Sequence, residues 1–253
     1  MKRLFSLGLP LAAFAGLLGW LQPMPSLPEG HDGLCRLVET PVETILCTVP
    51  LDRYALRLRA IGEDGRPFET FEKAREGLDG ARVRLMMNAG MYHEDRRPVG
   101  LAVQDGRVVK DAVLGRGTGN FSLRPNGIFF VENGRAFVRE TERYLSETHR
   151  PELATQSGPM LLVEGKVHPR FIDGSDSRYV RNGVGVSADG RTVYLAVTRR
   201  PVNFYDFALF FRDLVGVENA LFFDGQVCSL YYPEGGIDQR RDHLGPILAV
   251  TDR

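Results

Sequence analysis

The sequence predicts an α+β fold, built on a mixed, mostly antiparallel β-sheet with two or three packed helices. Short apolar runs recur between glycine-containing turns, which is typical of strands joined as hairpins. Only a few segments have apolar residues at helical spacing. The chain has 253 residues, 43% hydrophobic and 25% charged, so its composition is that of an ordinary globular protein.

The strands are predicted from short apolar segments and their turns. Asp105-Gly106 and Asn133-Gly134 each interrupt such a segment, and both dipeptides are typical of two-residue hairpin turns. In the segment 54–62, leucines alternate with arginines, which indicates a half-exposed strand. The segments predicted to contain strands are 43–51, 54–62, 83–92, 98–109, 127–138, 159–167, 183–198 and 220–223.

Two helices are predicted. In 68–80, Phe68, Phe71, Ala74 and Leu78 fall on one helical face, and a glycine ends the segment. In 203–216, Phe207, Phe210, Phe211 and Leu214 share a face, Asp206 lies near the start and Gly216 at the end.

The N-terminus has the pattern of an export signal. Lys2 and Arg3 precede residues 4–21, which carry no charge, so 1–21 is predicted to be a cleaved signal peptide or a retained membrane anchor. Residues 22–34 form a proline-rich linker, and 35–253 a single domain. We expect this domain in the periplasm or another extracytoplasmic compartment, with membrane contact only through residues 4–21.

Charge and cysteine content restrict the partners further. Lysine plus arginine equals aspartate plus glutamate, 32 each, so no field of one sign favours nucleic acid and no such partner is expected. Cys35 and Cys47 could form a disulfide in an oxidising compartment. Cys228 has no histidine nearby in the sequence, which favours a buried structural residue over a nucleophile.

Polar residues gather at four places where an apolar run meets a glycine-containing turn. Strand ends are rigid yet accessible, so side chains that meet there can build a pocket. Amides, hydroxyls, a guanidinium and a carboxylate together suit a polyhydroxylated, anionic ligand. The clusters are Asn88-Ala89-Gly90-Met91-Tyr92-His93, Gln156-Ser157-Gly158-Pro159, Arg181-Asn182-Gly183, and Asp224-Gly225 with the nearby Ser229.

Each cluster also has a purely structural interpretation. Asn-Gly and Asp-Gly are the commonest turn dipeptides, so any single cluster is more often a turn than a site. Arg181 could simply neutralise Asp224 in a structural ion pair. No metal-ligand spacing, calcium loop, nucleophile elbow or phosphate-binding glycine loop is found, so no metal or cofactor is expected.

Taken together and in order, the clusters resemble the phosphodiester glycosidase family, in particular its short bacterial branch. The resemblance covers roughly residues 43 to 250. Many members have Asp-Gly-Gly-x-Ser where this chain has Gln226 in place of the second glycine and the serine one position later. The residues that carry the resemblance are 87-MNAGMY-92, 98-PVGLAV-103, 119-GNF-121, 125-PNGIFF-130, 154-ATQSGPMLL-162, 181-RNGVGV-186 and 221-LFFDGQVCSLY-231.

The resemblance implies a hydrolase that breaks the bond between a sugar and a phosphodiester, for example in an envelope glycopolymer. It implies that Asp224 stabilises the oxocarbenium-like transition state or activates water, and that Arg181 holds the phosphate. A second carboxylate, if one is needed, has Glu94, Asp95 and Asp206 as candidates. The residues expected to bind substrate are Asn88, Gly90, Ser157, Gly158, Asn182, Gly225 and Ser229.

Two other functions stay open at this point. One is an envelope protein that binds the same glycan without cleaving it, and the other is a structural envelope protein without a small ligand. The oligomeric state, the sugar and the stereochemical outcome are not predicted.

Overall fold

The computed structural model describes residues 33–253 except 79, 116–118, 226 and 242. The predicted signal peptide or anchor, and the linker up to residue 32, lie outside the described residues. Within the described ranges, no helix is both long enough and apolar enough to cross a membrane.

Three β-sheets form the domain, and every strand pairing in the described part of the chain is antiparallel. We call them the seven-stranded sheet, the β4 sheet and the β7 sheet. In spatial order, the seven-stranded sheet contains β1 (Cys35–Val38), β2 (Thr44–Pro50), β13 (Thr192–Thr198), β12 (Asn182–Val186), β14 (Ala220–Phe222), β10 (Met160–Val163) and β11 (Lys166–Val167). The β4 sheet contains β16 (Ile237–Gln239), β15 (Leu230–Tyr232), β4 (Val83–Asn88), β17 (Ile247–Asp252) and β3 (Tyr54–Arg59). The β7 sheet contains β6 (Arg107–Lys110), β5 (Ala102–Gln104), β9 (Leu153–Ser157), β7 (Gly127–Glu132) and β8 (Arg135–Glu140).

The predicted hairpin turns are present. Asp105 and Gly106 have φ of 51° and 73°, and Asn133 and Gly134 have φ of 53° and 70°. Two successive positive φ angles are those of a turn whose twist matches the flanking strands, which is why Asn-Gly and Asp-Gly are favoured there. These turns connect β5 to β6 and β7 to β8.

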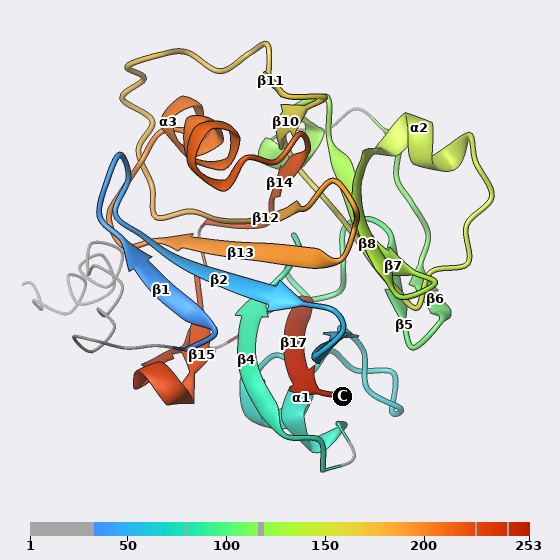
Figure 1. Cartoon of the computed structure of the whole chain (residues 1–253). Coiled ribbons are helices and arrows are strands. Elements are labelled where there is room, and N and C mark those ends of the chain that lie inside the picture. The colour runs from blue at the N-terminus through green and yellow to red at the C-terminus, as the bar shows by residue number, and fades with distance from the viewer. Residues whose placement is uncertain (1–32, 79, 116–118, 226, 242) are drawn as a thin grey trace, which may run out of the picture.

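The three sheets enclose one apolar core. Its residues come from all three, for instance Ile45 and Val184 from the seven-stranded sheet, Met87 from the β4 sheet, and Phe129 and Leu153 from the β7 sheet. In Figure 1 the seven-stranded sheet runs across the molecule, with β4 and β17 below it and β7 and β8 at one side. Because strands from three sheets share this core, the fold is predominantly non-local.

A helix covers the outer face of each sheet. Helix α1 (Phe71–Glu76) packs on the β4 sheet, α2 (Thr141–Leu145) on the β7 sheet, and α3 (Phe204–Leu209) on the seven-stranded sheet, above it in Figure 1. The described part of the chain also contains the 3₁₀ turns η2 (Asn120–Ser122) and η4 (Pro233–Gly235) and the π-helical η3 (Phe210–Val215). The predicted α+β class, with mostly antiparallel strands and two or three helices, is confirmed.

The predicted helix boundaries hold better in α3 than in α1. Asn203 caps α3 by accepting a hydrogen bond from the backbone N–H of Asp206 (2.8 Å), and Gly216 ends η3 with a φ of 76°. Leu214 is more exposed than its predicted place on the apolar face, because the π-helical turn displaces it from the 3.6-residue period. Helix α1 is shorter than predicted and begins after Thr70.

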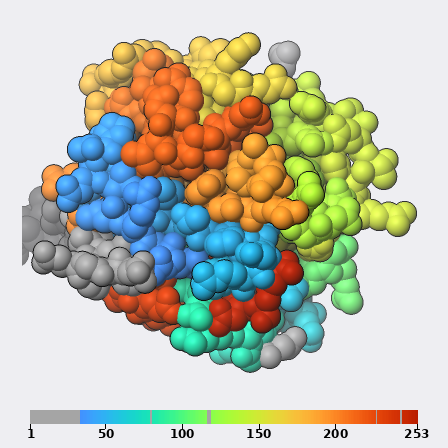
Figure 2. Space-filling view, in the orientation of Figure 1, coloured from blue at the N-terminus to red at the C-terminus, as the bar shows by residue number. Residues whose placement is uncertain are grey.

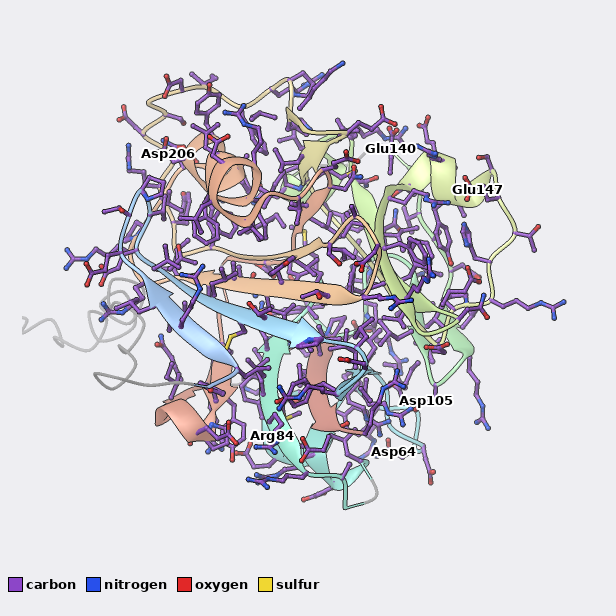
Figure 3. All side chains as sticks on the ribbon, viewed as in Figure 1. Asp64, Arg84, Asp105, Glu140, Glu147 and Asp206 are labelled. Carbon is purple, nitrogen blue, oxygen red and sulfur yellow. A yellow bond between two sulfur atoms is a disulfide. The ribbon has the colours of Figure 1, made fainter. Side chains whose placement is uncertain are left out.

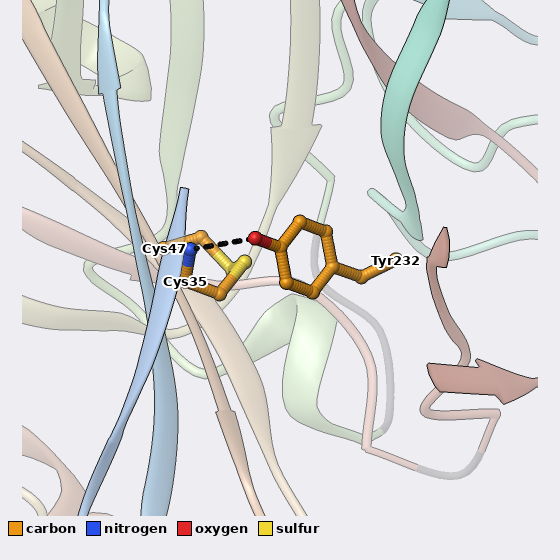
Figure 4. Close-up of a disulfide and its surroundings, with 3 residues drawn as sticks. All are labelled: Cys35, Cys47 and Tyr232. Atoms are coloured by element: carbon orange, nitrogen blue, oxygen red, sulfur yellow. Dashed lines mark hydrogen bonds between the residues drawn. A yellow bond between two sulfur atoms is a disulfide. The ribbon is translucent and has the colours of Figure 1, made fainter. Parts of the chain in front are cut away.

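A disulfide links β1 to β2. Cys35 and Cys47 lie directly opposite each other in these strands and their sulfurs are bonded (S–S 2.05 Å). The backbone N–H of Cys35 also donates to the hydroxyl of Tyr232 in the β4 sheet (3.4 Å; Figure 4). The disulfide therefore joins the edge strand β1 to β2, and the hydrogen bond to Tyr232 connects this edge to the β4 sheet.

The end of the chain lies beside strands from its beginning. Strand β17 pairs with β3 over six residue pairs, from Ile247 opposite Arg59 to Asp252 opposite Tyr54. Figure 2 shows the same proximity on the surface, where the red C-terminal atoms adjoin the blue atoms of early strands. This closure holds β4 between β15 and β17 and so fixes the position of its last residue, Asn88.

Candidate active site

Three strand ends from two sheets meet at the candidate site. Asn88 is the last residue of β4, Asn182 is the first residue of β12, and Asp224 follows β14 by two positions. Strands β12 and β14 are antiparallel neighbours with Gly183 opposite Phe222, so the start of one lies beside the end of the other. The topology thus brings three of the four predicted clusters to one place.

A network of side-chain amides joins these three ends. The Oδ1 atom of Asn88 accepts from the Nδ2 of Asn182 (2.9 Å) and from the backbone N–H of Ser229 (3.0 Å). The Nδ2 of Asn88 donates to the carbonyl of Asp224 (3.0 Å), and the Oδ1 of Asn182 accepts from the backbone N–H of Asp224 (3.0 Å). Both backbone polar groups of Asp224 are therefore held by buried asparagines, which fixes the peptide that carries the carboxylate.

Two serines support the same segment. The Oγ of Ser157, at the end of β9, donates to the carbonyl of Phe223 (2.7 Å). The Oγ of Ser229 donates to the carbonyl of Val227 (2.9 Å) and accepts from the backbone N–H of Arg241 (3.0 Å). Asn88, Ser157, Asn182 and Ser229 are all buried, and their side chains bond the protein's own groups. Together they hold the backbone of Phe223, Asp224, Val227 and Ser229.

At each of the three predicted site glycines, another part of the protein lies too close for a side chain. A Cβ atom on Gly225 would lie 2.5 Å from the carbonyl oxygen of Val180, so only glycine lets Asp224 sit this near to β12. A Cβ on Gly90 would lie 2.8 Å from the Oγ1 of Thr155. A Cβ on Gly158 would lie 2.7 Å from the Cβ of Asn126.

Arg181 is a buried cation held by an aromatic cage and backbone carbonyls. Its guanidinium carbon lies 3.5 Å from the ring centroid of Phe204 and 5.6 Å from those of Tyr179 and Phe222. Its Nε donates to the carbonyl of Val202 (2.8 Å) and its Nη2 to that of Ser177 (3.0 Å). Only 1% of the residue is exposed, and burial lowers the pKa of Arg181 to about 10, which leaves it charged at neutral pH.

Arg181 does not neutralise Asp224 through an ion pair. Among the described residues, no carboxylate forms an ion pair with its guanidinium, whose hydrogen bonds come from Nε and Nη2. The backbones of the two residues nevertheless lie opposite each other, because the register of β12 and β14, continued by two positions, pairs Arg181 with Asp224. A buried positive charge without an acidic partner is costly in a folded protein.

Tyr92 is a further residue near the carboxylate; it belongs to the first polar cluster, but no role was predicted for it from the sequence. Burial, followed by the negative charge of Asp224, raises the pKa of the Tyr92 phenol. The guanidinium of Arg96 lies 5.2 Å from the ring centroid of Tyr92, which adds a second cation on this side. The signal was present in the sequence, since Tyr92 closes the 87–92 motif that contains Asn88.

Cys228 lies beneath the same segment as a buried thiol. Its Sγ is 3.7 Å from the carbonyl oxygen of Asp224. Burial and the charge of Asp224 raise the pKa of the Cys228 thiol, which keeps it protonated. A protonated, buried thiol is a poor nucleophile, so the geometry agrees with the structural interpretation of this residue.

The three candidates for a second carboxylate lie in turns and caps. Asp206 accepts from the Nδ2 of Asn203 (2.9 Å) in the cap of α3, beside which Figure 3 shows it. Asp95 accepts from the backbone N–H of Arg97 (3.1 Å), and Glu94 is exposed next to it. In the described part of the chain, no group of three or more histidine, cysteine, aspartate or glutamate side chains is arranged to hold a metal ion.

The site thus combines one carboxylate whose peptide is held by buried asparagines with one buried cation. Comparison with known proteins gives the family. The sequence profile of the phosphodiester glycosidases (NAGPA) matches residues 81–244, which is more than half of the chain. The chain belongs to the phosphodiester glycosidase family.

Relatives and solved structures agree with this assignment. The uncharacterized protein YigE of Escherichia coli K12 is 34% identical over 169 residues, covering 67% of this chain and 66% of that protein's own length. The zebrafish N-acetylglucosamine-1-phosphodiester α-N-acetylglucosaminidase catalytic domain, solved in a form auto-inhibited by its pro-peptide, has a TM-score of 0.60 at 15% identity, with coverage of 92% and 89%. A hypothetical protein from Synechocystis has a TM-score of 0.55 at 14% identity, covering 87% of this chain and 61% of that chain. At such low identity the two structures show a shared fold.

Proposed function

We propose that this protein hydrolyses the glycosidic bond of a sugar-1-phosphate diester. The observation that carries the proposal is the buried Arg181 guanidinium, which has no acidic partner in the described part of the chain and lies beside the braced Asp224. A phosphodiester supplies the missing negative charge, and the sugar attached to it then lies next to the carboxylate. Arginine binds phosphate oxygens through geometrically matched donors.

In this reaction the bond between the anomeric carbon and the bridging oxygen breaks. Its electron pair goes to the phosphate, which leaves as a monoester, while the oxygen of water forms the new bond to the anomeric carbon. Asp224 has two roles that fit this chemistry: stabilising the positive charge that develops on the sugar, and accepting the proton of water. A phosphate monoester is a good leaving group, so the reaction depends less on a second, acidic carboxylate.

The residues predicted to bind substrate receive a positioning role in this proposal. Asn88, Ser157, Asn182 and Ser229 hold the peptide of Asp224, and Gly225 lets it approach β12. Such bracing fixes the carboxylate before substrate arrives, which is how enzymes limit the reorganisation needed during reaction.

We further propose that the enzyme is exported and acts on an envelope glycopolymer, as a periplasmic or membrane-tethered domain. The charge pattern of residues 1–21 supports export, and the Cys35–Cys47 disulfide suits an oxidising compartment. Accessibility of the domain to protease in intact and osmotically shocked cells tests the compartment.

Hydrolysis in ¹⁸O-water tests the reaction class. The purified domain from residue 33 onward is incubated with methyl diesters of several hexose 1-phosphates, including N-acetylglucosamine-α-1-phosphate. Cleavage of the glycosidic bond yields methyl phosphate without ¹⁸O, whereas attack at phosphorus would place ¹⁸O in a phosphorus-containing product. Binding of these diesters without turnover would instead identify a glycan-binding protein.

A further inference from the structure

Two adjacent arginines, Arg96 and Arg97, lie in the turn of a hairpin that follows β4. The N–H of His93 donates to the carbonyl of Arg97 (2.9 Å), and the N–H of Arg96 donates to the carbonyl of His93 (2.8 Å). Arg97 is exposed; its Nε lies 3.6 Å from the carboxylate of Asp95, and its Nη2 donates to the carbonyl of Gly65 (2.8 Å). Arg97 thus has the contacts of an ordinary surface arginine.

Arg96 differs from its neighbour in burial, in partners and in backbone conformation. It is half-buried, and within the described ranges no carboxylate forms an ion pair with its guanidinium, which lies 5.2 Å from the ring centroid of Tyr92. Its φ is 66°, a left-handed conformation that glycine and asparagine adopt more readily than arginine. An arginine held in this conformation without an acidic partner indicates that its side chain serves something other than stability.

Tyr92, the ring beside Arg96, is fixed next to the candidate site. It pairs with Pro98 across the hairpin, and a Cβ atom on Gly245 would lie 2.4 Å from Cδ1 of its ring, so the ring packs directly against the backbone there. Burial, followed by the charge of Asp224, raises the pKa of the Tyr92 phenol, and the charge and hydrogen bonding of Arg96 offset part of the rise. Tyr92 is therefore close enough to respond to both charges.

We propose that Arg96 is a second phosphate-binding residue of the candidate site, acting from the hairpin after β4 while Arg181 acts from the start of β12. The inference rests on the proposed function, in which a phosphodiester lies beside Asp224. A phosphodiester has two non-bridging oxygens that share its negative charge, and a guanidinium presents several N–H donors in one plane. Two arginines from different sheets can therefore each bind one of these oxygens.

A second cation at the phosphate also favours the reaction itself. As the bond to the anomeric carbon breaks, its electron pair moves to the phosphate, which becomes more negative. A guanidinium that is already in place stabilises this charge without rearrangement of the protein. Loss of Arg96 should therefore reduce both the binding of phosphate and the rate of hydrolysis.

Isothermal titration calorimetry of the purified protein with methyl phosphate, the leaving group of the methyl diesters, tests this site without requiring turnover. Arg96→Asn removes the guanidinium and supplies a residue that tolerates a positive φ. We expect this variant to bind methyl phosphate about tenfold more weakly than the wild type, because a charge-assisted contact is lost. Its Tm should equal or exceed that of the wild type, because backbone strain is relieved. Arg96→Gln, with a longer side chain, should show the same loss of affinity.

Arg97→Asn is the matched control, because it removes the neighbouring guanidinium from the same turn. Arg97 is exposed and already paired with Asp95, so this variant should bind methyl phosphate within about twofold of the wild type. Equal losses in Arg96→Asn and Arg97→Asn would indicate only the general charge of the turn and would overturn the proposal. Wild-type affinity in Arg96→Asn, or no binding of methyl phosphate by the wild type, would also overturn it.

Diester hydrolysis separates this inference from the proposed function. With a hexose-1-phosphate methyl diester, we expect Arg96→Asn to lower kcat/KM about tenfold or more and Arg97→Asn to leave it unchanged. Wild-type kinetics in Arg96→Asn would leave the proposed reaction intact and overturn the role of Arg96. If the wild type cleaves no diester yet binds methyl phosphate in a manner that depends on Arg96, the proposed reaction fails and phosphate binding by Arg96 is supported.

Discussion

Two of the Asp-Gly pairs in this protein show how differently the same dipeptide can be used: Asp105-Gly106 after β5 and Asp224-Gly225 shortly after β14. At the first, both residues have positive φ, and a Cβ on Gly106 would meet nothing within 4 Å. At the second, Gly225 has no positive φ, and a Cβ there would lie 2.5 Å from a backbone carbonyl. The first glycine is needed for backbone conformation and the second for close approach.

The two aspartates differ in which of their groups is held by residues distant in the sequence. The carboxylate of Asp105 meets surrounding arginines, with Nη1 of Arg59 at 3.1 Å and Nη1 of Arg57 at 3.8 Å, near the position labelled in Figure 3. The N–H and carbonyl of Asp224 are held by Asn182 and Asn88. A dipeptide alone therefore does not distinguish a turn from a site; the long-range partners of its backbone do.

Alanine at the two glycines is expected to give the largest contrast. Gly225→Ala forces Asp224 away from β12, which should lower activity about 100-fold and the free energy of unfolding by about 3 kcal/mol. Gly106→Ala keeps wild-type activity and costs about 1 kcal/mol, because alanine tolerates positive φ poorly. Rates and urea denaturation of both variants measure this, and equal losses would remove the distinction between the two pairs.

Removing the amide of Asn88 tests the bracing directly. Asn88→Ala leaves the buried N–H of Ser229 without its acceptor, and removes one of the two acceptors of the Asn182 Nδ2 and the amide donor to the carbonyl of Asp224, so the free energy of unfolding should fall by about 3 kcal/mol. Asn133→Ala, in the β7–β8 turn, is the control and should cost about 1 kcal/mol. Similar values for both variants would show that the network contributes no more than a turn.

Acid should lower the stability of the protein through a buried histidine near Arg181. His168 stacks on Phe171, which stacks on Phe204, the ring beneath Arg181. Burial lowers the pKa of His168 to about 4, so below pH 6.5 the unfolded chain binds a proton that the folded protein does not, and stability falls with pH until about pH 4.

The change in the free energy of unfolding between two pH values measures the contribution of this histidine. From pH 7 to pH 5 the wild type should lose about 2 kcal/mol more than His168→Phe in urea denaturation. The exposed His93 is the control, and His93→Gln should follow the wild type. Parallel pH curves for wild type and His168→Phe would contradict a neutral, buried His168.

The smallest effect is expected at Asp105. Asp105→Asn removes the charge that faces Arg57 and Arg59, and should cost about 1 kcal/mol or less because the carboxylate is half exposed. The loss should shrink further in 1 M salt, which thermal denaturation at two salt concentrations would reveal. A loss that is large and insensitive to salt would mean that Asp105 has a structural role beyond its ion pairs.

Local sequence patterns predict the hairpins, the α3 segment and the meeting of the strand ends. Asn133-Gly134 and Gly216 adopt the backbone angles for which these residues are favoured. Strand β9 was not predicted as such, because Thr155, Gln156 and Ser157 look like loop residues until their distant backbone partners are known. Strands β15 and β17 were also missed, since both depend on pairing with β4, more than a hundred residues earlier.

The candidate site shows the same limit. The sequence brings Asn88, Asn182 and Asp224 together through strand ends and a family pattern, and the structure joins them by hydrogen bonds. The sequence alone does not reveal that Asn88 and Asn182 are buried, because their burial arises from packing between two sheets. The aromatic cage of Arg181 was missed for the same reason, since Phe204 and Phe222 come from different elements.

The catalytic role of Asp224 is tested most directly by comparing Asp224→Asn with Asp105→Asn in the hydrolysis of a hexose-1-phosphate methyl diester. Both changes replace a carboxylate by an amide of the same shape, and circular dichroism checks that each variant is folded. We expect kcat to fall about 10³-fold in Asp224→Asn and to stay at the wild-type value in Asp105→Asn. An Asp224→Asn variant that keeps kcat within tenfold of the wild type would contradict the assignment of Asp224 as the catalytic carboxylate.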